Sequence, residues 1–275
     1  MSNPAENRLR RIIILGHKGF VGASLKRHFD DADCGLEVVG LDLPELDLAS
    51  GKGMGSLSRL LTPDACLIML AAIKRQFGDT LEAFTQNVKM AVNLCALIGK
   101  RPVGRVVFFS STAVYGEDIH NTGITEDTSV CPTSYYGMAK FASERLFWKA
   151  ASLHDRTSLV LLRPPTIYGP GDEGDTYGPV RFAKAAAKGR RLTLWGDGTE
   201  LREFVFIEDV AIVVRKLVFS GYDGVLNLVS GNSSSFRDVL EAVEAVSGRR
   251  LDTDLRERTK AKVDNAFRND RLLEV

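Results

Sequence analysis

The sequence lacks any marked excess of charge of one sign. Its 275 residues include 36 lysines and arginines against 35 aspartates and glutamates, which gives a formal net charge of +1. Proteins that bind nucleic acid or an anionic membrane through surface charge normally have a clear basic excess. We therefore expect no nucleic acid and no membrane among the partners of this chain.

Cysteine is scarce, and its spacing argues against a metal site. The four cysteines, Cys34, Cys66, Cys95 and Cys131, are far apart, and the sequence has no CxxC pair and no Cys/His cluster. Structural zinc sites need clustered ligands of this kind, so we expect no bound metal. Cys66 and Cys95 fall in apolar segments and are expected to be buried thiols. Unclustered cysteines in a chain of this size are typical of a reducing compartment.

Long hydrophobic runs are absent as well. The first residues, MSNPAENRLRRIIILG, contain an apolar run that is too short for a secretory signal peptide. No other segment is apolar over the length that is needed to span a bilayer. We therefore expect a cytoplasmic protein. The chain also has no repeats and no low-complexity tracts, and its length suits one large domain with a smaller appendage.

The sequence does contain a series of short apolar runs, and segments with helical spacing separate them. The apolar runs lie within residues 11–16, 35–43, 63–72, 104–116 and 158–171, and the helical segments within 20–31, 81–100 and 134–154. Strands without polar alternation are buried on both faces, which is typical of a parallel sheet with helices on each side. We therefore predict an α/β fold with a Rossmann-type doubly wound parallel sheet. In such sheets ligands bind at the carboxyl ends of the strands.

The first strand ends in a glycine-rich turn of the form GxxGxxG, from Gly16 to Gly22. Such a turn between a strand and a helix brings the backbone and the helix N-terminus close to a pyrophosphate. Asp42 follows at the end of the second strand, where an acid binds the ribose hydroxyls of NAD and disfavours the 2′-phosphate of NADP. Lys18, a cation within the turn, leaves NADP open as an alternative. The turn predicts a bound dinucleotide, with NAD expected.

The sequence also predicts a domain boundary near Gly169, because the alternation of strands and helices becomes irregular after this residue. We assign residues 1–168 to the NAD-binding Rossmann domain and residues 169–275 to a smaller substrate-binding lobe. Part of residues 203–230 is expected to pack back on the first domain.

A tyrosine and a lysine are placed for proton transfer in the helix that begins near Ser134. Tyr136 and Lys140 are four residues apart and share one face of that helix, whereas Tyr135 points elsewhere. An ammonium beside a phenol stabilises the phenolate, so we expect a lowered pKa for Tyr136. Ser111, in the polar turn after the fourth strand, can bond the oxygen that reacts. These three residues are the candidate catalytic set.

With these motifs, the sequence resembles the extended short-chain dehydrogenase/reductase family, in its NAD-dependent nucleotide-sugar epimerase/dehydratase branch. The resemblance covers residues 11–248 and depends on motifs in a fixed order: GHKGFVG, two LDL tripeptides at 41–43 and 46–48, LAAIK, SSTAVYG, SYYGMAK, LRPPTIYGPG and WGDGTELREFVFIEDVA. Each motif is modest by itself, and together they are highly specific.

The resemblance implies a role for each matching position. It implies that Ser111, Tyr136 and Lys140 are catalytic. It implies that the cofactor is bound by Gly16, Gly19, Phe20, Val21, Asp42, Leu43, Asp47, Leu48, Leu70, Ala71, Ala72, Lys74, Tyr136 and Lys140. It implies that the substrate, a nucleotide-diphosphate sugar, is bound by Asn87, Thr112, Thr166 and Arg202. It further implies a homodimer that forms through two long helices.

Some positions differ from the pattern of the family. Thr166 stands where an asparagine is usual, and the sequence shows no clear second arginine for the diphosphate. Thr112 and Ala113 replace the Asp-Glu pair of sugar 4,6-dehydratases, which makes that activity less favoured. We expect an NAD-dependent nucleotide-sugar epimerase that acts at C4 through a transient keto-sugar. The alternative is an NAD(P)H-dependent reductase of nucleotide keto-sugars.

Overall fold

The computed structural model describes residues 9–31, 35–174 and 178–275. Most of the N-terminal stretch, Cys34 and part of the glycine-rich loop after Gly169 lie outside the described residues. Where the structure describes the chain, no helix is both long enough and apolar enough to cross a membrane.

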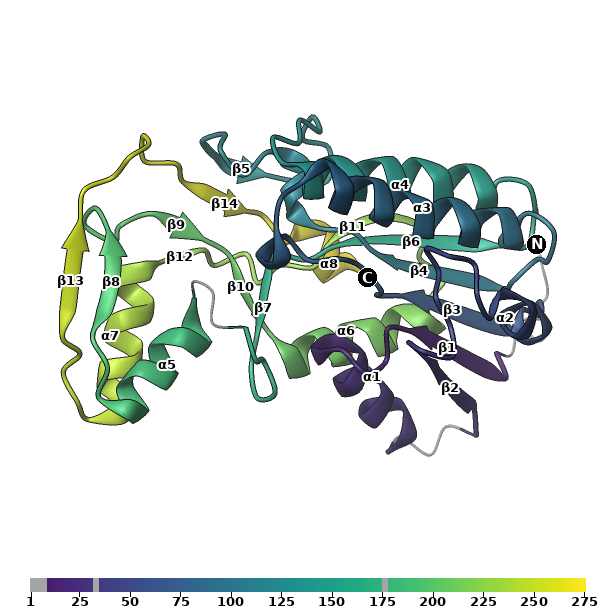
Figure 1. The fold of residues 1–275 in the computed structure, drawn as a ribbon, viewed down its shortest axis with the longest axis horizontal. Helices are drawn as coiled ribbons and strands as arrows, with labels where there is room; N and C mark the ends of the chain where they lie inside the picture. The colour runs from purple at the N-terminus through teal and green to yellow at the C-terminus, as the bar shows by residue number, and fades with distance from the viewer. Residues whose placement is uncertain (1–8, 32–34, 175–177) are drawn as a thin grey trace.

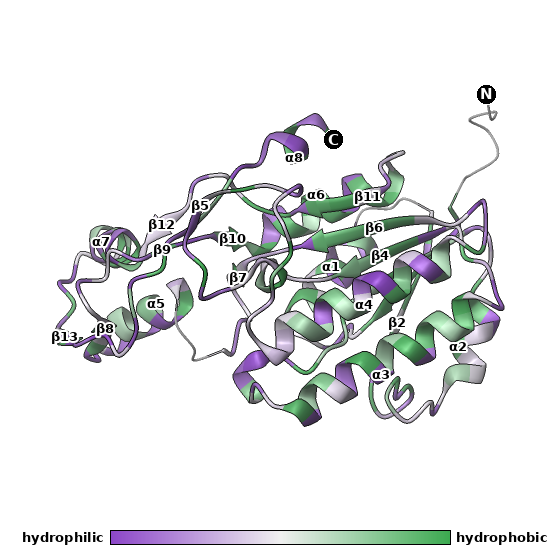
Figure 2. Cartoon of the chain, turned by 90° about the horizontal axis from the view of Figure 1, so that it is seen from above, coloured by the Kyte–Doolittle hydropathy of each residue, from purple (hydrophilic) through white to green (hydrophobic). Residues whose placement is uncertain are grey.

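The centre of the molecule is a six-stranded sheet in which every pair of neighbouring strands is parallel. The strands lie in the order β11 (Gly224–Asn227), β6 (Ser158–Arg163), β4 (Arg105–Phe109), β3 (Ala65–Met69), β1 (Arg11–Leu15) and β2 (Glu37–Leu41). The predicted doubly wound parallel sheet is therefore confirmed. Figure 2 shows β4 and β6 as hydrophobic strands, as expected for strands that are covered on both faces.

Helices cover both faces of this sheet because alternate side chains along each strand point to opposite sides. Ile13 and Leu15 of β1 pack with side chains of the helices on one face, which are α2 (Met54–Leu60), α3 (Leu81–Ile98) and α4 (Tyr135–Ala151). Ile12 and Ile14 pack with side chains of α1 (Phe20–Asp30) and α6 (Ile207–Phe219) on the other face. Figure 1 shows α3 and α4 above the sheet and α1 and α6 below it.

The order of the strands reverses at β1, and this reversal locates the binding region. The chain passes from β1 to β2 on one side and then returns to β3 on the other side of β1. The connections that leave the carboxyl ends of β1 and β3 therefore diverge, which opens a crevice at this edge. The glycine-rich turn follows β1 and lies at this crevice.

The second lobe has a separate core of its own. In it α5 (Pro179–Lys188) and α7 (Phe236–Ser247) pack against the parallel pair β8 (Leu192–Trp195) and β13 (Thr253–Arg256), around Phe182 and Leu251. Figure 1 shows this lobe beside the carboxyl edge of the main sheet. Within residues 169–275, α6 and β11 belong to the first lobe, because β11 pairs with β6 and α6 packs in the core below the sheet.

Short elements join the two lobes. Three further strand pairs are β7 (Thr166–Tyr168) with β10 (Phe204–Phe206), β9 (Leu201–Arg202) with β12 (Ser234–Ser235), and β5 (Asn121–Ile124) with β14 (Asn265–Phe267). The remaining elements are two 3-10 helices, η1 (Arg75–Phe77) and η2 (Thr112–Tyr115), and the helix α8 (Asp270–Glu274).

Candidate active site

A cavity of about 500 Å³ lies at the carboxyl ends of β1, β3, β4 and β6, where the second lobe meets the sheet. Its lining includes most of the residues that the sequence singled out. From the cofactor set these are Gly16, Gly19, Phe20, Val21, Leu70, Ala72, Lys74, Tyr136 and Lys140, and from the others Ser111, Thr112 and Thr166. Asp42, Leu43, Asp47, Leu48 and Ala71 are not part of the lining.

The glycine-rich turn has the shape that a pyrophosphate requires. A Cβ atom at Gly22 would lie 2.1 Å from the carbonyl oxygen of Gly16, so only glycine allows the start of α1 to approach the end of β1. Gly19 is the N-cap of α1, and no side chain caps the helix there. The first N–H groups of α1 are therefore available to an anion. The turn fits a dinucleotide, and it would hold the pyrophosphate.

At the end of β2, Asp42 and Lys18 meet. The two Asp42 carboxylate oxygens accept hydrogen bonds from the backbone N–H groups of Lys18 (3.0 Å) and Leu43 (2.8 Å). The Lys18 ammonium donates to the Leu43 carbonyl at 2.9 Å and lies 3.5 Å from Glu45. The Asp42 carboxylate still has lone pairs that can accept hydrogen bonds from ribose hydroxyls. The Lys18 ammonium, which could bind a 2′-phosphate, is instead held by Leu43 and Glu45. The residues present therefore fit NAD.

Two other residues of the predicted adenosine site have roles in the local backbone. Asp47 accepts hydrogen bonds from the backbone N–H groups of Ala49 and Ser50, at 2.9 Å and 3.1 Å. Leu48 is buried in the core. Asp47 thus stabilises the turn that follows β2.

The candidate catalytic residues come together because α4 packs very closely against η2. A Cβ atom at Gly137 would lie 2.6 Å from the carbonyl oxygen of Ala113, so glycine at this position permits the approach. Ser134 is the N-cap of α4 and accepts from the Gly137 N–H at 3.1 Å. The Tyr136 N–H donates to Asp79 at 2.9 Å. These contacts fix the first turn of α4 beside Ser111, which is the N-cap of η2.

Tyr136, Ser111 and Lys140 all line the same cavity. The phenol of Tyr136 is hydrogen-bonded to the Ser111 side chain. The Lys140 ammonium lies 5.7 Å from the centroid of the Tyr136 ring and donates to the Phe109 carbonyl at 2.7 Å. Tyr135 does not line the cavity, and its ring lies 6.4 Å from that of Phe84 in α3. Of the two adjacent tyrosines, Tyr136 is therefore the one that lines the cavity.

The expected low pKa of Tyr136 is wrong for the free protein. Burial raises the pKa of Tyr136 to about 12, and the negative charge of Glu117 acts in the same direction, whereas the hydrogen bond with Ser111 opposes both. Burial also lowers the pKa of Lys140 to about 8, while the charge of Glu144 opposes this shift. The Lys140 ammonium donates to a backbone carbonyl and makes no hydrogen bond to the phenol among the contacts described, and burial is the main cause of both pKa shifts. At neutral pH the phenol is protonated and most of the lysine is charged.

Two of the predicted substrate residues lie away from this cavity. The Asn87 side chain accepts from the Ile73 N–H at 2.8 Å and donates to the Ile73 carbonyl at 3.0 Å. It holds the segment after β3 and is not part of the lining. Arg202 lines a second cavity of about 570 Å³.

This second cavity contains a cationic cluster that sequence reasoning missed. Arg258 lies beside Arg202, because both guanidinium groups contact the carboxylate of Glu200. Trp195 and Lys260 also line the cavity. One buried nitrogen of Arg258, Nη2, makes no hydrogen bond within the described residues. The sequence feature that could have indicated this cluster is the basic segment at 256–260. In the folded chain, Arg258 of this segment lies beside Arg202 of β9.

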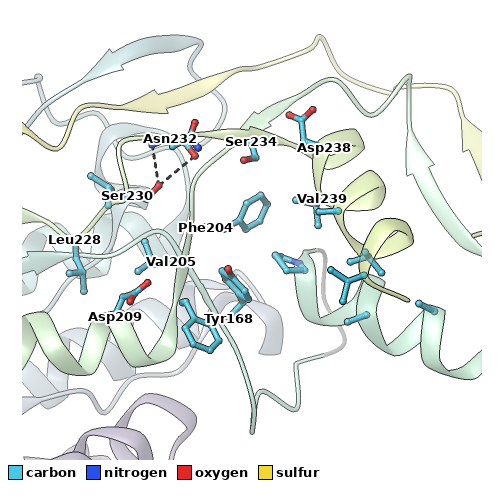
Figure 3. Close-up of a pocket in the computed structure, with 18 of the residues that line it drawn as sticks. Tyr168, Phe204, Val205, Asp209, Leu228, Ser230, Asn232, Ser234, Asp238 and Val239 are labelled. Atoms are coloured by element: carbon cyan, nitrogen blue, oxygen red, sulfur yellow. Dashed lines mark hydrogen bonds between the residues drawn. The ribbon is translucent and has the colours of Figure 1, made fainter. Parts of the chain in front are cut away.

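A third cavity, of about 1090 Å³, contains none of the candidate catalytic residues. Figure 3 shows the side chains of Tyr168, Phe204 and Val239 directed into it. The lining is mostly apolar and comes from α5, α6, α7 and β10. Ser111, Tyr136 and Lys140 line the smaller cavity together with the glycine-rich turn, so that cavity is the candidate active site. In the part of the chain that the structure describes, no cluster of three or more metal-ligating side chains occurs.

Comparison with known proteins agrees with this geometry. The chain is 25% identical to the UDP-glucose 4-epimerase of Azospirillum brasilense, over 88% of this chain and 78% of that protein. It is 26% identical to a dTDP-4-dehydro-6-deoxy-D-allose reductase from a Streptomyces species, over 87% of this chain and 82% of the relative.

Solved structures match over nearly the whole chain. The UDP-glucose 4-epimerase of Thermus thermophilus in complex with NAD has a TM-score of 0.83 and 24% identity, and the match covers 96% of this chain and 92% of that one. MoeE5 in complex with UDP-glucose and NAD has a TM-score of 0.80 and 26% identity, over 96% and 91% of the two chains. The model of the NAD dependent epimerase/dehydratase family matches residues 12–224. This chain is therefore an enzyme that belongs to the NAD-dependent epimerase/dehydratase family.

Proposed function

We propose that this enzyme is an NAD-dependent nucleotide-sugar epimerase that inverts C4 of the sugar through a transient keto-sugar. The main support is the convergence of Ser111, Tyr136 and Lys140 in one cavity with the glycine-rich turn. An epimerase needs one proton-transfer group beside one bound dinucleotide, and this cavity offers both. When bound, NAD supplies the hydride acceptor and a positively charged ring.

The residues of this chain move the proton. Once its phenol is ionised, Tyr136 takes the proton of the C4 hydroxyl as the sugar is oxidised and returns it when the keto oxygen is reduced, so the cycle begins and ends with the phenolate and no proton is gained or lost overall. Ser111 bonds the reacting oxygen and stays linked to the phenol. Lys140 stabilises the phenolate, which requires the ammonium to turn from the Phe109 carbonyl towards the ring. In that position the ammonium would offset the burial that raises the pKa of Tyr136 in the free protein.

The nucleotide part of the substrate is proposed to occupy the second cavity. Arg202 and Arg258 supply paired guanidinium groups, which suit the two phosphates of a nucleotide diphosphate. Trp195 supplies an aromatic face for the base. Glu117 and Asp118 are neighbours in sequence and line the first and second cavity respectively, so one extended substrate can reach both. Thr112 and Thr166 then face the sugar.

We also propose a homodimer that is formed through α3 and α4. Leu81, Val92, Met138 and Trp148 belong to these two helices and are all exposed, at 61%, 45%, 41% and 52%. Large apolar side chains along two adjacent helices are typical of a surface that is covered by a partner.

A reductase of nucleotide keto-sugars is the alternative, and Lys18 is the observation that favours it. This cation lies at the end of β2 and could bind the 2′-phosphate of NADPH if it left Leu43 and Glu45. The similarity to a dTDP-keto-sugar reductase is of the same degree as the similarity to epimerases.

One experiment separates the two activities. The purified protein is denatured and the released nucleotide is identified by mass spectrometry. The native protein is then incubated with UDP-, GDP-, dTDP- and CDP-hexoses, and both sugar composition and reduced-nicotinamide absorbance are followed. We expect retained NAD and a new C4 epimer without net absorbance change. Consumption of NADPH with a keto-sugar, and no epimer from any hexose, would contradict the proposal.

A further inference from the structure

A buried ion pair lies behind the candidate active site. Glu144 of α4 and Arg163 at the end of β6 are only 1% and 4% exposed. The guanidinium donates two hydrogen bonds to the carboxylate, from Nε at 2.9 Å and from Nη2 at 2.7 Å. This two-pronged geometry is the strongest form of a carboxylate–arginine contact. The pair is fully formed, although neither residue lines the cavity.

The ion pair and its hydrogen-bond partners connect the ends of several strands. Ser110, directly after β4, donates its hydroxyl to Glu144. Arg163 also donates to the Tyr115 phenol at 2.8 Å, and that phenol donates to Asn227 of β11 at 2.8 Å. The ends of β4, β6 and β11 and the 3-10 helix η2 are thus joined through buried polar contacts. Ser111 lies within this set, between Ser110 and η2.

The same carboxylate is aligned with the catalytic residues along α4. Tyr136, Lys140 and Glu144 follow one another at intervals of four residues and share one face of the helix. Glu144 therefore lies one turn beyond the ammonium of Lys140. Burial lowers the pKa of Lys140 to about 8, and the negative charge of Glu144 acts against this shift. Without that charge, less of the lysine would be protonated at neutral pH.

Stability alone does not account for such a pair. Removing two charges from water costs several kcal/mol, and apolar replacements of a buried pair are often as stable. We propose that Glu144 is a positioning residue, which holds the strand end that bears Ser111 and keeps Lys140 charged for proton transfer. This inference rests on the function proposed above. It assigns to Glu144 a role in catalysis without contact with the substrate.

Other charged groups near Lys140 differ from Glu144 in their surroundings. Arg163 lies on β6 and is ion-paired with Glu144, and the charge that acts on Lys140 is that of Glu144. The remaining charged residues belong to the cavity lining and are less buried, namely Lys74, Arg75, Glu117, Asp172 and Arg181. Glu117 is paired with Arg75 at 2.6 Å. Glu144 is thus the buried anion whose charge acts on Lys140.

Two substitutions at one position separate charge from geometry. Glu144→Gln removes the charge and keeps the length of the side chain. Glu144→Asp keeps the charge but is one methylene shorter, so it cannot reach Ser110 and Arg163 together. The titration of Lys140 is followed by NMR of protein with ¹³C-labelled lysine, and Lys140→Met identifies the signal. The same proteins are assayed for epimerisation as a function of pH.

We expect Glu144→Gln to move the Lys140 titration, and the alkaline limb of the rate profile, to lower pH by about one unit. Glu144→Asp is expected to lower kcat about tenfold and leave the titration near its wild-type pH. If Glu144→Gln does not fold, the double variant E144Q/R163M replaces it, because no uncompensated charge is then buried. A smaller downward shift is expected there, because the positive charge of Arg163 is removed as well.

An unchanged Lys140 titration after loss of the Glu144 charge would overturn the inference and leave the pair a structural contact. The lysine titration needs no substrate, so it tests the role of Glu144 even if the wild-type protein epimerises none of the hexoses. A lack of epimerisation by the wild-type protein would count against the proposed function and not against the role of Glu144.

Discussion

Removal of a single hydroxyl group at Tyr136 should separate catalysis from folding. Tyr136→Phe keeps the ring beside Lys140 and deletes the phenol that is bonded to Ser111. Loss of one hydrogen bond costs about 1 kcal/mol of stability, and Ser111 still accepts from the Ala113 N–H at 3.1 Å. Loss of a general acid–base costs about 10²- to 10⁴-fold in rate. The barrier should therefore rise by about 3–5 kcal/mol, which exceeds the change in stability several-fold.

The measurement compares kcat, thermal unfolding and retained nucleotide in Tyr136→Phe and in the control Tyr135→Phe. Tyr135 is 41% exposed and lies beside Phe84, so its hydroxyl has no part in the proposed proton transfer. We expect the control to keep most of its activity and both variants to retain NAD. Equal loss of activity in the two variants would refute the assignment of Tyr136.

Four further predictions concern the binding sites and the assembly. Gly22→Ala places a Cβ 2.1 Å from the Gly16 oxygen, so we expect about 1–3 kcal/mol less stability and no NAD after purification. Asp42→Asn should weaken NAD binding about tenfold, as for hydrogen bonds to a charged group, and reduce discrimination against NADP in calorimetric titrations. Arg258→Met should raise the KM of the nucleotide sugar about tenfold, with NAD retention unchanged. Trp148→Glu should convert a dimer to a monomer in light scattering, and a wild-type monomer would contradict the proposed interface.

The strands of the main sheet were predictable because burial on both faces leaves a clear sequence signal. The run from Arg11 to Leu15 contains no polar residue after its first position, and the structure buries Ile12 to Leu15 completely. The glycine turn and the placing of Tyr136 and Lys140 on one helix face were predictable for a similar reason. Both depend on the geometry of a single turn or a single helix, which short spacings in the sequence specify.

The protonation states were not predictable in this way. Helical spacing places Lys140 on the face of Tyr136, yet the Phe109 carbonyl attracts the ammonium and burial raises the pKa of the phenol to about 12. The pKa of a side chain depends on solvent exclusion and on every nearby dipole. Both quantities arise from elements that are distant in the sequence, here β4 and the loop that contains Glu117.

The proposed substrate-binding residues were the hardest to predict from the sequence, because they come from segments that are far apart along the chain. Arg258 was missed as a neighbour of Arg202, because the two are 56 positions apart, α6 and α7 lie between them, and no short motif joins them. Asn87 lies on the expected helix, but its amide bonds Ile73 and does not reach the cavity. A side chain's partner depends on which segments the fold brings together.

By itself, the sequence determined the parallel sheet, the glycine turn, and the shared helix face of Tyr136 and Lys140, because periodicity and short-range spacing specify local geometry. Only the tertiary structure decided the protonation of Tyr136 and Lys140, the pairing of Glu144 with Arg163, and the meeting of Arg202 with Arg258. These features depend on burial and on distances between strand ends, and both exist only after the chain has folded around its sheet.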